Sequence, residues 1–188
     1  MTRFILHGGA TNLPVESNRE FFKVSVPSLN KKIKVLIIYF ARKKEDYPWM
    51  FEQDVNNFKT NSPKKDLEFV IADDNIGLLK KQISDSDVIY VRGGNTIPLV
   101  KKLKQVGDLK KLLENKVYAG SSAGMYAIAK YYYSNDRNRI EKGLSILPIK
   151  AFAHWEDAKQ EIINKLDAYK EKLPIYKVRE GEFVIIEQ

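Results

Sequence analysis

The sequence predicts an α/β fold in which helices cover both faces of a mainly parallel sheet, giving three layers (αβα). Short apolar runs alternate with longer segments of helical periodicity, and this alternation is typical of parallel strands joined by helices. The central apolar runs are nearly continuous in Val, Ile, Leu and Tyr, which indicates strands buried on both faces. No repeat or low-complexity linker interrupts the series, so residues 1–188 are expected to form one domain.

Several segments rich in β-branched and aromatic residues are predicted to be strands. In chain order they are Arg3–His7, Lys34–Phe40, Leu67–Ala72, Asp87–Arg92, Lys116–Ala119, Ile175–Val178 and Glu182–Ile186. The last two flank the sequence Arg-Glu-Gly at 179–181, which is typical of a hairpin turn. We therefore expect the C-terminal pair to form a hairpin that closes one edge of the sheet.

The segments between these strands carry the predicted helices, which are Ser17–Val24, Lys44–Lys59, Ile76–Ile83, Thr96–Leu113, Ala123–Tyr132 and Trp155–Lys172. In the last of them Ala158, Ile162, Leu166 and Tyr169 recur at three- and four-residue steps. That spacing places them on one face of a helix, so they are expected to form a buried stripe.

The chain is basic, with a net charge of +8 and a pI near 9.4. A clustered basic face would attract nucleic acid. The lysine pairs, however, are scattered along the chain without a nucleic-acid-binding signature, which favours a solvated surface. No apolar run approaches the ~20 residues that cross a bilayer, and the N-terminus lacks a signal-peptide pattern. We expect a soluble cytoplasmic protein with no membrane partner, and nucleic-acid binding stays the less favoured alternative.

The residue inventory restricts the chemistry further. Cysteine is absent, which excludes disulfides, thiolate metal sites and cysteine nucleophiles. Only His7 and His154 offer an imidazole, so a histidine-rich metal site is disfavoured. Neither the dinucleotide-binding glycine pattern nor a P-loop occurs. No metal and no cofactor are expected.

Ligands of open α/β sheets bind beyond the carboxyl ends of the strands, and glycine-containing segments follow predicted strands at 7–11, 92–96 and 120–124. The strongest signal is Gly120-x-Ser122-x-Gly124, which stands between an apolar strand and a helical run. A nucleophile elbow requires this strand, turn and helix context. Ser122 is therefore the candidate nucleophile. The alternative interpretation is a serine that only caps a helix.

A serine nucleophile needs a base, and the base needs an orienting group. His154 stands after a short apolar run and before the last helix, so it is the preferred base. His7, which ends a strand and begins a glycine turn, is the alternative. For the orienting acid we favour Asp136, at the far end of the helix that Ser122 begins. The acids left open are Asp73, Asp74 and Glu156.

Acyl transfer also needs hydrogen-bond donors for an oxyanion. One donor is usually the N–H of the residue after the nucleophile, which here is Ala123. The other comes from a neighbouring strand loop. Glycine lets a backbone amide approach closely, so Gly94 is the expected second donor.

These motifs together resemble peptidase family S51, which contains dipeptidase E (aspartyl dipeptidase) and, more distantly, cyanophycinase. The resemblance rests on YVRGGNT, YAGSSAGM, the later SND and the histidine before the final helix, and it covers about residues 87–155. It implies a flavodoxin-like fold similar to class I glutamine amidotransferases, with serine in place of their cysteine. It also implies hydrolysis of short peptides with an N-terminal aspartate. The implied roles are those given above for Ser122, His154, Asp136, Gly94 and Ala123.

An acidic peptide substrate needs a cationic ligand, and the planar fork of arginine suits a carboxylate. Arginine is scarcer than lysine in this chain. Arg92, before the Gly-Gly turn, and Arg137 and Arg139, after Asp136, are the candidates, with Asn95 beside them. Two other interpretations stay open at this point: a serine esterase or amidase that acts on another small metabolite, and a non-catalytic binding module on the same fold.

Overall fold

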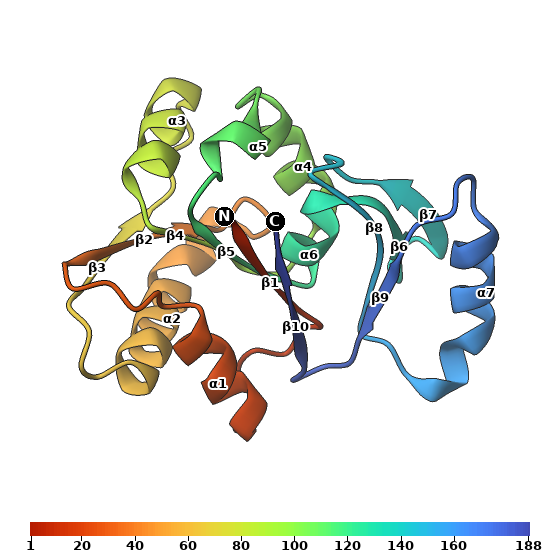
Figure 1. Cartoon of the computed structure of the whole chain (residues 1–188), viewed down its shortest axis with the longest axis horizontal. Helices are drawn as coiled ribbons and strands as arrows, with labels where there is room; N and C mark the ends of the chain where they lie inside the picture. The colour runs from red at the N-terminus through yellow and green to blue at the C-terminus, as the bar shows by residue number, and fades with distance from the viewer.

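The computed structural model describes residues 1–188 and contains two sheets (Figure 1). The larger sheet has six strands in the order β10-β1-β5-β4-β2-β3. These strands are β1 (Arg3–His7), β2 (Ile33–Ile38), β3 (Leu67–Ile71), β4 (Val88–Val91), β5 (Val117–Ser121) and β10 (Phe183–Glu187). All neighbours pair in parallel except β10, which is antiparallel to β1.

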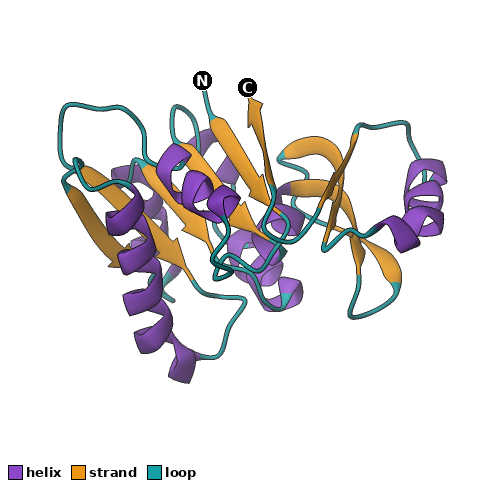
Figure 2. Ribbon diagram, turned by 90° about the horizontal axis from the view of Figure 1, so that it is seen from below, coloured by secondary structure: helices purple, strands orange, loops and turns teal.

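Helices cover both faces of the larger sheet, which confirms the predicted three-layer arrangement (Figure 2). On one face lie α1 (Glu16–Val24) and α2 (Tyr47–Asn61), and on the other lie α3 (Ile76–Asp85), α4 (Thr96–Lys104), α5 (Leu109–Leu112) and α6 (Ala123–Ile128). Successive strand residues point to opposite faces. Ile37 accordingly belongs to the core under α1 and α2, whereas Ile38 belongs to the core under the other helices.

The second sheet has four strands in the order β7-β6-β8-β9. Its strands are β6 (Ala129–Ser134), β7 (Arg139–Lys142), β8 (Leu147–Ala153) and β9 (Ile175–Val178). Helix α7 (Gln160–Ala168) packs on its outer side, with Leu166 fully buried against Tyr133 and Phe152. One continuous apolar cluster includes residues of both sheets, for example Leu6 of β1 and Leu147 of β8.

Three of the predicted helices are wrong in extent. The segment Trp155–Lys172 is an α-helix only over Gln160–Ala168, and of the expected buried stripe only Leu166 is fully buried, whereas Ala158 is exposed. The segment Ala123–Tyr132 is helical only to Ile128 and then becomes strand β6. Its second half is rich in tyrosine, which suits a strand, and Tyr131, Tyr132 and Tyr133 are all buried, so both faces of the strand are covered. The predicted helix Thr96–Leu113 is divided into α4 and α5 around Gly107, whose φ is +86°.

The predicted C-terminal hairpin is also wrong. Strand β9 pairs with β8 in the smaller sheet, whereas β10 pairs with β1 over five residues in the larger one. The turn at 179–182 therefore connects the two sheets. Strand β10 does lie at an edge of its sheet, as expected. The same pairing brings the chain ends together, because the N–H of Gln188 donates to the carbonyl of Thr2 at 3.0 Å.

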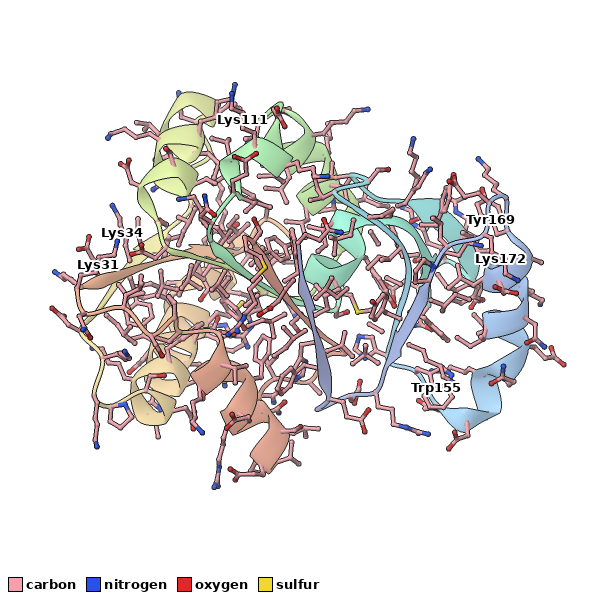
Figure 3. All side chains as sticks on the ribbon, in the orientation of Figure 1. Lys31, Lys34, Lys111, Trp155, Tyr169 and Lys172 are labelled. Carbon is pink, nitrogen blue, oxygen red and sulfur yellow. The ribbon has the colours of Figure 1, made fainter.

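The lysines are spread over the molecule. Figure 3 shows Lys31 and Lys34 at one end and Lys172 at the other, with Lys111 on a third side. Several have nearby carboxylates, such as Asp87 at 2.7 Å from Lys31. This distribution favours the expected solvated surface over one basic binding face. None of the helices has the length and apolar composition needed to cross a membrane.

Candidate active site

Ser122 stands at the junction between β5 and α6. Its φ of 47° lies in the left-handed region that residues with a Cβ rarely adopt. Its N–H donates to the carbonyl of His7 at 2.9 Å, and its carbonyl accepts the N–H of Tyr126 at 3.0 Å. A Cβ at Gly124 would lie 2.7 Å from the carbonyl oxygen of Val91, so the close crossing after Ser122 requires glycine. The local sequence therefore produces the sharp strand-to-helix turn that the motif predicts.

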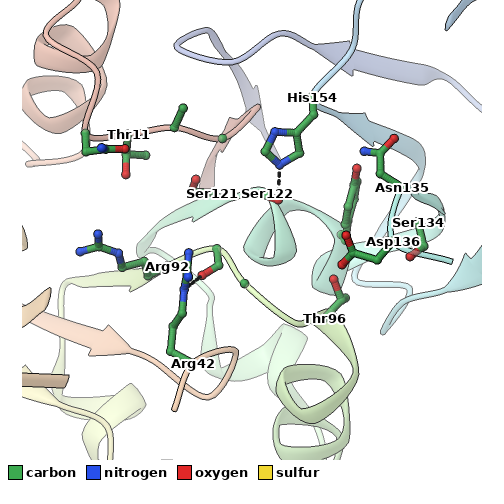
Figure 4. Close-up of a pocket in the computed structure, with 16 residues that line it drawn as sticks. Thr11, Arg42, Arg92, Thr96, Ser121, Ser122, Ser134, Asn135, Asp136 and His154 are labelled. Atoms are coloured by element: carbon green, nitrogen blue, oxygen red, sulfur yellow. Dashed lines mark hydrogen bonds between the residues drawn. The ribbon is translucent and has the colours of Figure 1, made fainter. Parts of the chain in front are cut away.

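The side chain of Ser122 faces His154. The Oγ of Ser122 lies 2.8 Å from Nε2 of His154 (Figure 4). His154 follows β8, and the residue before it, Ala153, is held from α6, because the Tyr126 hydroxyl donates to its carbonyl at 3.1 Å and accepts its N–H at 3.0 Å. The helix that begins at Ser122 thus also fixes the position of His154.

The other ring nitrogen of His154 is held by a residue that the sequence did not single out. Nδ1 of His154 lies 2.6 Å from Oε1 of Glu180, in the turn between β9 and β10. A carboxylate at Nδ1 keeps the proton on that nitrogen and leaves Nε2 free to accept the serine proton. A signal was present, because Glu180 comes two residues after the predicted strand Ile175–Val178. The predicted hairpin placed Glu180 in a turn at the edge of the sheet, so nothing in the sequence indicated a pairing with His154.

Asp136 does not make the expected contact with His154. It lies in the turn between β6 and β7 and lines the same pocket, but Glu180 occupies the position of the orienting acid. Its neighbour Asn135 donates from Nδ2 to the carbonyl of Ala153 at 3.2 Å. The Ser-Asn-Asp turn therefore supports the end of the strand that precedes His154. The carboxylate of Asp136 faces the pocket from another side (Figure 4).

His7 has a different environment from His154. Its fully buried ring accepts the N–H of Gly9 at Nδ1 (3.0 Å) and has Nε2 2.7 Å from Oδ1 of Asn18. Gly9 in turn packs against the ring of His154, where an added Cβ would lie 2.2 Å from Cε1. His7 thus supports the glycine turn behind His154 rather than contacting the Ser122 hydroxyl.

This burial predicts a pH-dependent stability. Burial lowers the pKa of His7 from 6.5 to about 4. The unfolded chain takes up the proton below pH 6.5 while the folded chain resists it. The contribution of His7 is thus complete above pH 6.5 and is lost as the pH falls toward 4. We expect the free energy of unfolding to fall by about 2–3 kcal/mol through this residue between about pH 7 and about pH 4.5.

Denaturant unfolding of the wild type and His7→Gln at both pH values measures this loss. Carboxylates also titrate in this range, so the prediction concerns the difference between the two pH dependences. The wild type should lose more stability than His7→Gln. Equal losses in both proteins would show that His7 is not the titrating group.

Backbone amides beside Ser122 are available to an oxyanion. The N–H groups of Gly93 and Gly94 donate to no acceptor within the chain, and both residues line the pocket with Ser122. Gly93 lies directly beside the serine, since a Cβ there would be 3.1 Å from Cβ of Ser122. Ala123, the other expected donor, is the buried first residue of α6. Gly93 is therefore a candidate for the second oxyanion donor together with Gly94, the residue that the sequence predicted.

The arginines expected to bind substrate already form ion pairs with carboxylates of the chain. Arg92 lines the pocket, but its guanidinium is buried and lies 3.0 Å from the carboxylate of Asp54. Arg137 and Arg139 lie outside the pocket lining and pair with Glu141 at 3.3 and 2.7 Å. We therefore correct the assignment of Arg92 and Arg137 as free ligands of a substrate.

Asn95 is likewise engaged, because its Oδ1 caps α4 by accepting the N–H of Ile97 at 3.1 Å. It does not line the pocket. The cationic side chain that does so without a carboxylate partner is Arg42, in the loop after β2. Sequence reasoning missed Arg42 because it stands in a basic loop, Arg42-Lys43-Lys44, without a motif.

The pocket around Ser122 has a volume of about 320 Å³ and is lined mainly by polar groups. That volume is at the lower end of the range for small-molecule sites. The charged residues in its lining are Arg42, Arg92, Asp136 and, when protonated, His154. The described residues include no cluster of three His, Cys, Asp or Glu side chains that could hold a metal ion.

A serine–histidine–carboxylate arrangement at the carboxyl end of a parallel sheet is typical of hydrolases that use a serine nucleophile. The profile of peptidase family S51 matches residues 4–188, and the chain belongs to this family. Family membership places it among the peptidases, which are hydrolases.

Known proteins with similar sequences or folds agree with this family. The uncharacterized peptidase Lmo0363 of Listeria monocytogenes is 28% identical over 134 residues, which cover 63% of this chain and 65% of that protein. The match thus spans less than two thirds of that relative. The crystal structure of a Listeria monocytogenes protein provisionally assigned as peptidase E has a TM-score of 0.64 at 20% identity, covering 100% of this chain and 99% of that one.

A peptidase from an acI-B1 Actinobacterium has a TM-score of 0.65 at 17% identity. The comparison covers 99% of this chain and 83% of that one. At these identities the two solved structures support the fold, which is the flavodoxin-like α/β fold that the sequence predicts.

Proposed function

We propose that the protein is a serine exopeptidase of the dipeptidase E type that hydrolyses short peptides with an N-terminal aspartate. The observation that carries the proposal is the line of contacts from Ser122 Oγ to His154 Nε2 and from His154 Nδ1 to Glu180. Serine is a weak nucleophile unless a base is within hydrogen-bonding reach and is itself oriented by a third group. Ser122 meets both conditions. The continuous core of the two sheets supports one domain over residues 1–188.

In the first half of the reaction, Nε2 of His154 accepts the Ser122 proton as Oγ bonds to the carbonyl carbon of the peptide. The carbonyl oxygen becomes an oxyanion, which receives hydrogen bonds from the N–H of Ala123 and from the Gly93–Gly94 turn. The imidazolium is stabilised by Glu180. It then gives its proton to the leaving amine as the C–N bond breaks, and an acyl-enzyme remains.

In the second half, His154 takes a proton from water as the water oxygen attacks the acyl carbon. The tetrahedral intermediate collapses, the bond to Oγ breaks, and His154 returns its proton to Ser122. The N-terminal residue leaves as a free acid. Each step uses side chains and amides of this chain alone.

A panel of peptides and esters tests the proposal. We expect Asp-Ala to be hydrolysed with a higher kcat/KM than Glu-Ala, Ala-Ala and Leu-Ala, and a fluorophosphonate to label the protein and abolish the activity. Faster cleavage of p-nitrophenyl acetate than of any peptide would favour an esterase. If the wild type is neither labelled nor active on the panel, the serine-hydrolase function is wrong.

A further inference from the structure

We propose that Arg42 binds a carboxylate of the substrate and that Asp136, on the other side of Ser122, binds its α-ammonium group. This inference rests on the proposed function and adds the two residues that select the substrate. In Figure 4 the Ser122–His154 pair lies between the labelled side chains of Arg42 and Asp136. Both residues belong to the lining of the same pocket.

The charge of Arg42 is not neutralised within the chain. Its Nε donates to the carbonyl of Gly93 at 2.5 Å, and its two terminal nitrogens have no partner. The other arginine of the pocket, Arg92, is paired with Asp54. The guanidinium of Arg42 can therefore offer two parallel N–H groups to a carboxylate, which is the arrangement that makes arginine a strong carboxylate ligand.

The surroundings of Arg42 also favour a bound anion. Arg42 is exposed, yet partial desolvation beside the pocket wall, followed by the positive charge of Arg92, lowers its pKa. A carboxylate in the pocket would offset the desolvation and the repulsion together. The nearby residues Lys43 and Lys44 are directed to other acids, Glu45 and Asp74, so Arg42 is the cation that remains for the ligand.

Asp136 carries the complementary charge. It is the one Asp or Glu residue in the pocket lining, and it is exposed. The basic residues that follow it, Arg137 and Arg139, are paired with Glu141, and Asp136 makes no ion pair. An ammonium group in the pocket would therefore meet a carboxylate whose charge is free.

This arrangement selects a small zwitterion and orients it across Ser122. Peptides that begin with aspartate contain two possible carboxylates for Arg42: the side chain of the first residue and the C-terminus of a dipeptide. Both present the same chemistry to a guanidinium. The experiment therefore separates them with Asp-Ala, Asn-Ala and Asp-Ala amide.

In Arg42→Gln, we expect kcat/KM for Asp-Ala to fall about 10- to 100-fold, as for the loss of a hydrogen-bonded charge partner. If Arg42 binds the aspartate side chain, the variant should lose the preference for Asp-Ala over Asn-Ala. If Arg42 binds the C-terminal carboxylate, the variant should lose the preference for Asp-Ala over Asp-Ala amide. Arg42→Lys should recover part of the loss. The matched control is Lys43→Gln, at an exposed neighbour outside the pocket lining, which should behave as wild type. Both preferences remaining unchanged in Arg42→Gln would overturn the assignment.

A purely supporting role for Arg42, through its bond to Gly93, gives a different result. All substrates would then lose rate by the same factor, and fluorophosphonate labelling would slow in parallel. Under our proposal, labelling by an uncharged fluorophosphonate slows much less than Asp-Ala turnover. A parallel loss overturns the proposal.

The role of Asp136 in binding the α-ammonium group is tested by comparing Asp-Ala with N-acetyl-Asp-Ala as substrates of the wild type and of Asp136→Asn. The wild type should prefer the free amine, and the variant should lose about 10-fold of that preference, mainly through KM. An unchanged preference contradicts the role of Asp136.

Binding measurements distinguish a failure of this inference from a failure of the proposed function. Calorimetry of Asp-Ala with Ser122→Ala and with Ser122→Ala/Arg42→Gln requires no turnover. An affinity about 10-fold lower in the double variant supports Arg42 as the ligand even if the wild type hydrolyses no peptide. Equal affinities overturn the inference even if the wild type is an active peptidase.

Discussion

Ser122→Ala is expected to lower kcat/KM for the best dipeptide by at least ~10³-fold, because removing a triad serine disables the covalent route as a unit. The residual rate would come from binding and from the backbone amides beside the site. Fluorophosphonate labelling should disappear in the same variant. Steady-state kinetics and mass spectrometry of the labelled protein measure the two effects.

The adjacent residue Ser121 provides the matched control. It is buried at the end of β5, and although it also lines the pocket, its hydroxyl makes no hydrogen bond with His154. Ser121→Ala should keep its turnover within a few-fold and should still be labelled. Near-native turnover by Ser122→Ala would refute the nucleophile assignment, provided that unfolding curves show both variants to be folded.

Glu180→Gln is expected to lower kcat by about 10²- to 10⁴-fold, the scale of effect seen when a triad carboxylate becomes an amide. A carboxylate can only accept from Nδ1 of His154, whereas an amide can also donate to it. Donation would place the imidazole proton on Nε2, the nitrogen that must accept from Ser122. The loss should appear in kcat with little change in the unfolding free energy, because Glu180 is more than half exposed.

Two further variants make this prediction specific. Glu182→Gln removes another exposed carboxylate from the same turn, one that makes no hydrogen bond or ion pair with His154, so the kcat of this variant should resemble that of the wild type. Asp136→Asn should act mainly on KM for peptides with a free amine. If Asp136→Asn abolishes kcat while Glu180→Gln does not, the original sequence prediction of Asp136 as the orienting acid is right.

The local sequence was sufficient for most of the larger sheet and for the elbow. Strands such as Val88–Val91 form where continuous apolar residues, most of them β-branched, occur, because such runs are stable only when covered on both faces. The elbow was predictable because its constraints involve a few consecutive residues. The segment Gly120-x-Ser122-x-Gly124 forms the junction between β5 and α6, and the glycine at 124 also allows close packing on Val91.

The second sheet was harder to predict from the sequence. The run after Ile128 is apolar and aromatic, a composition that fits a buried helix as well as a buried strand over so short a length. Its pairing with β7 and β8 decides in favour of the strand. These partners lie further along the chain, so periodicity within the segment contains no information about them.

The orienting acid and the free arginine were decided by the tertiary structure alone. Glu180 reaches His154 because β9 and β10 join different sheets, and Arg42 reaches the pocket because β2 lies beside β4, whose loop carries Gly93. The sequence by itself determined the fold class, the elbow and the residue types available for catalysis. Local patterns report backbone preference and burial. Which side chains meet across the pocket depends on strand order and on the path between the sheets, and packing of distant segments sets both.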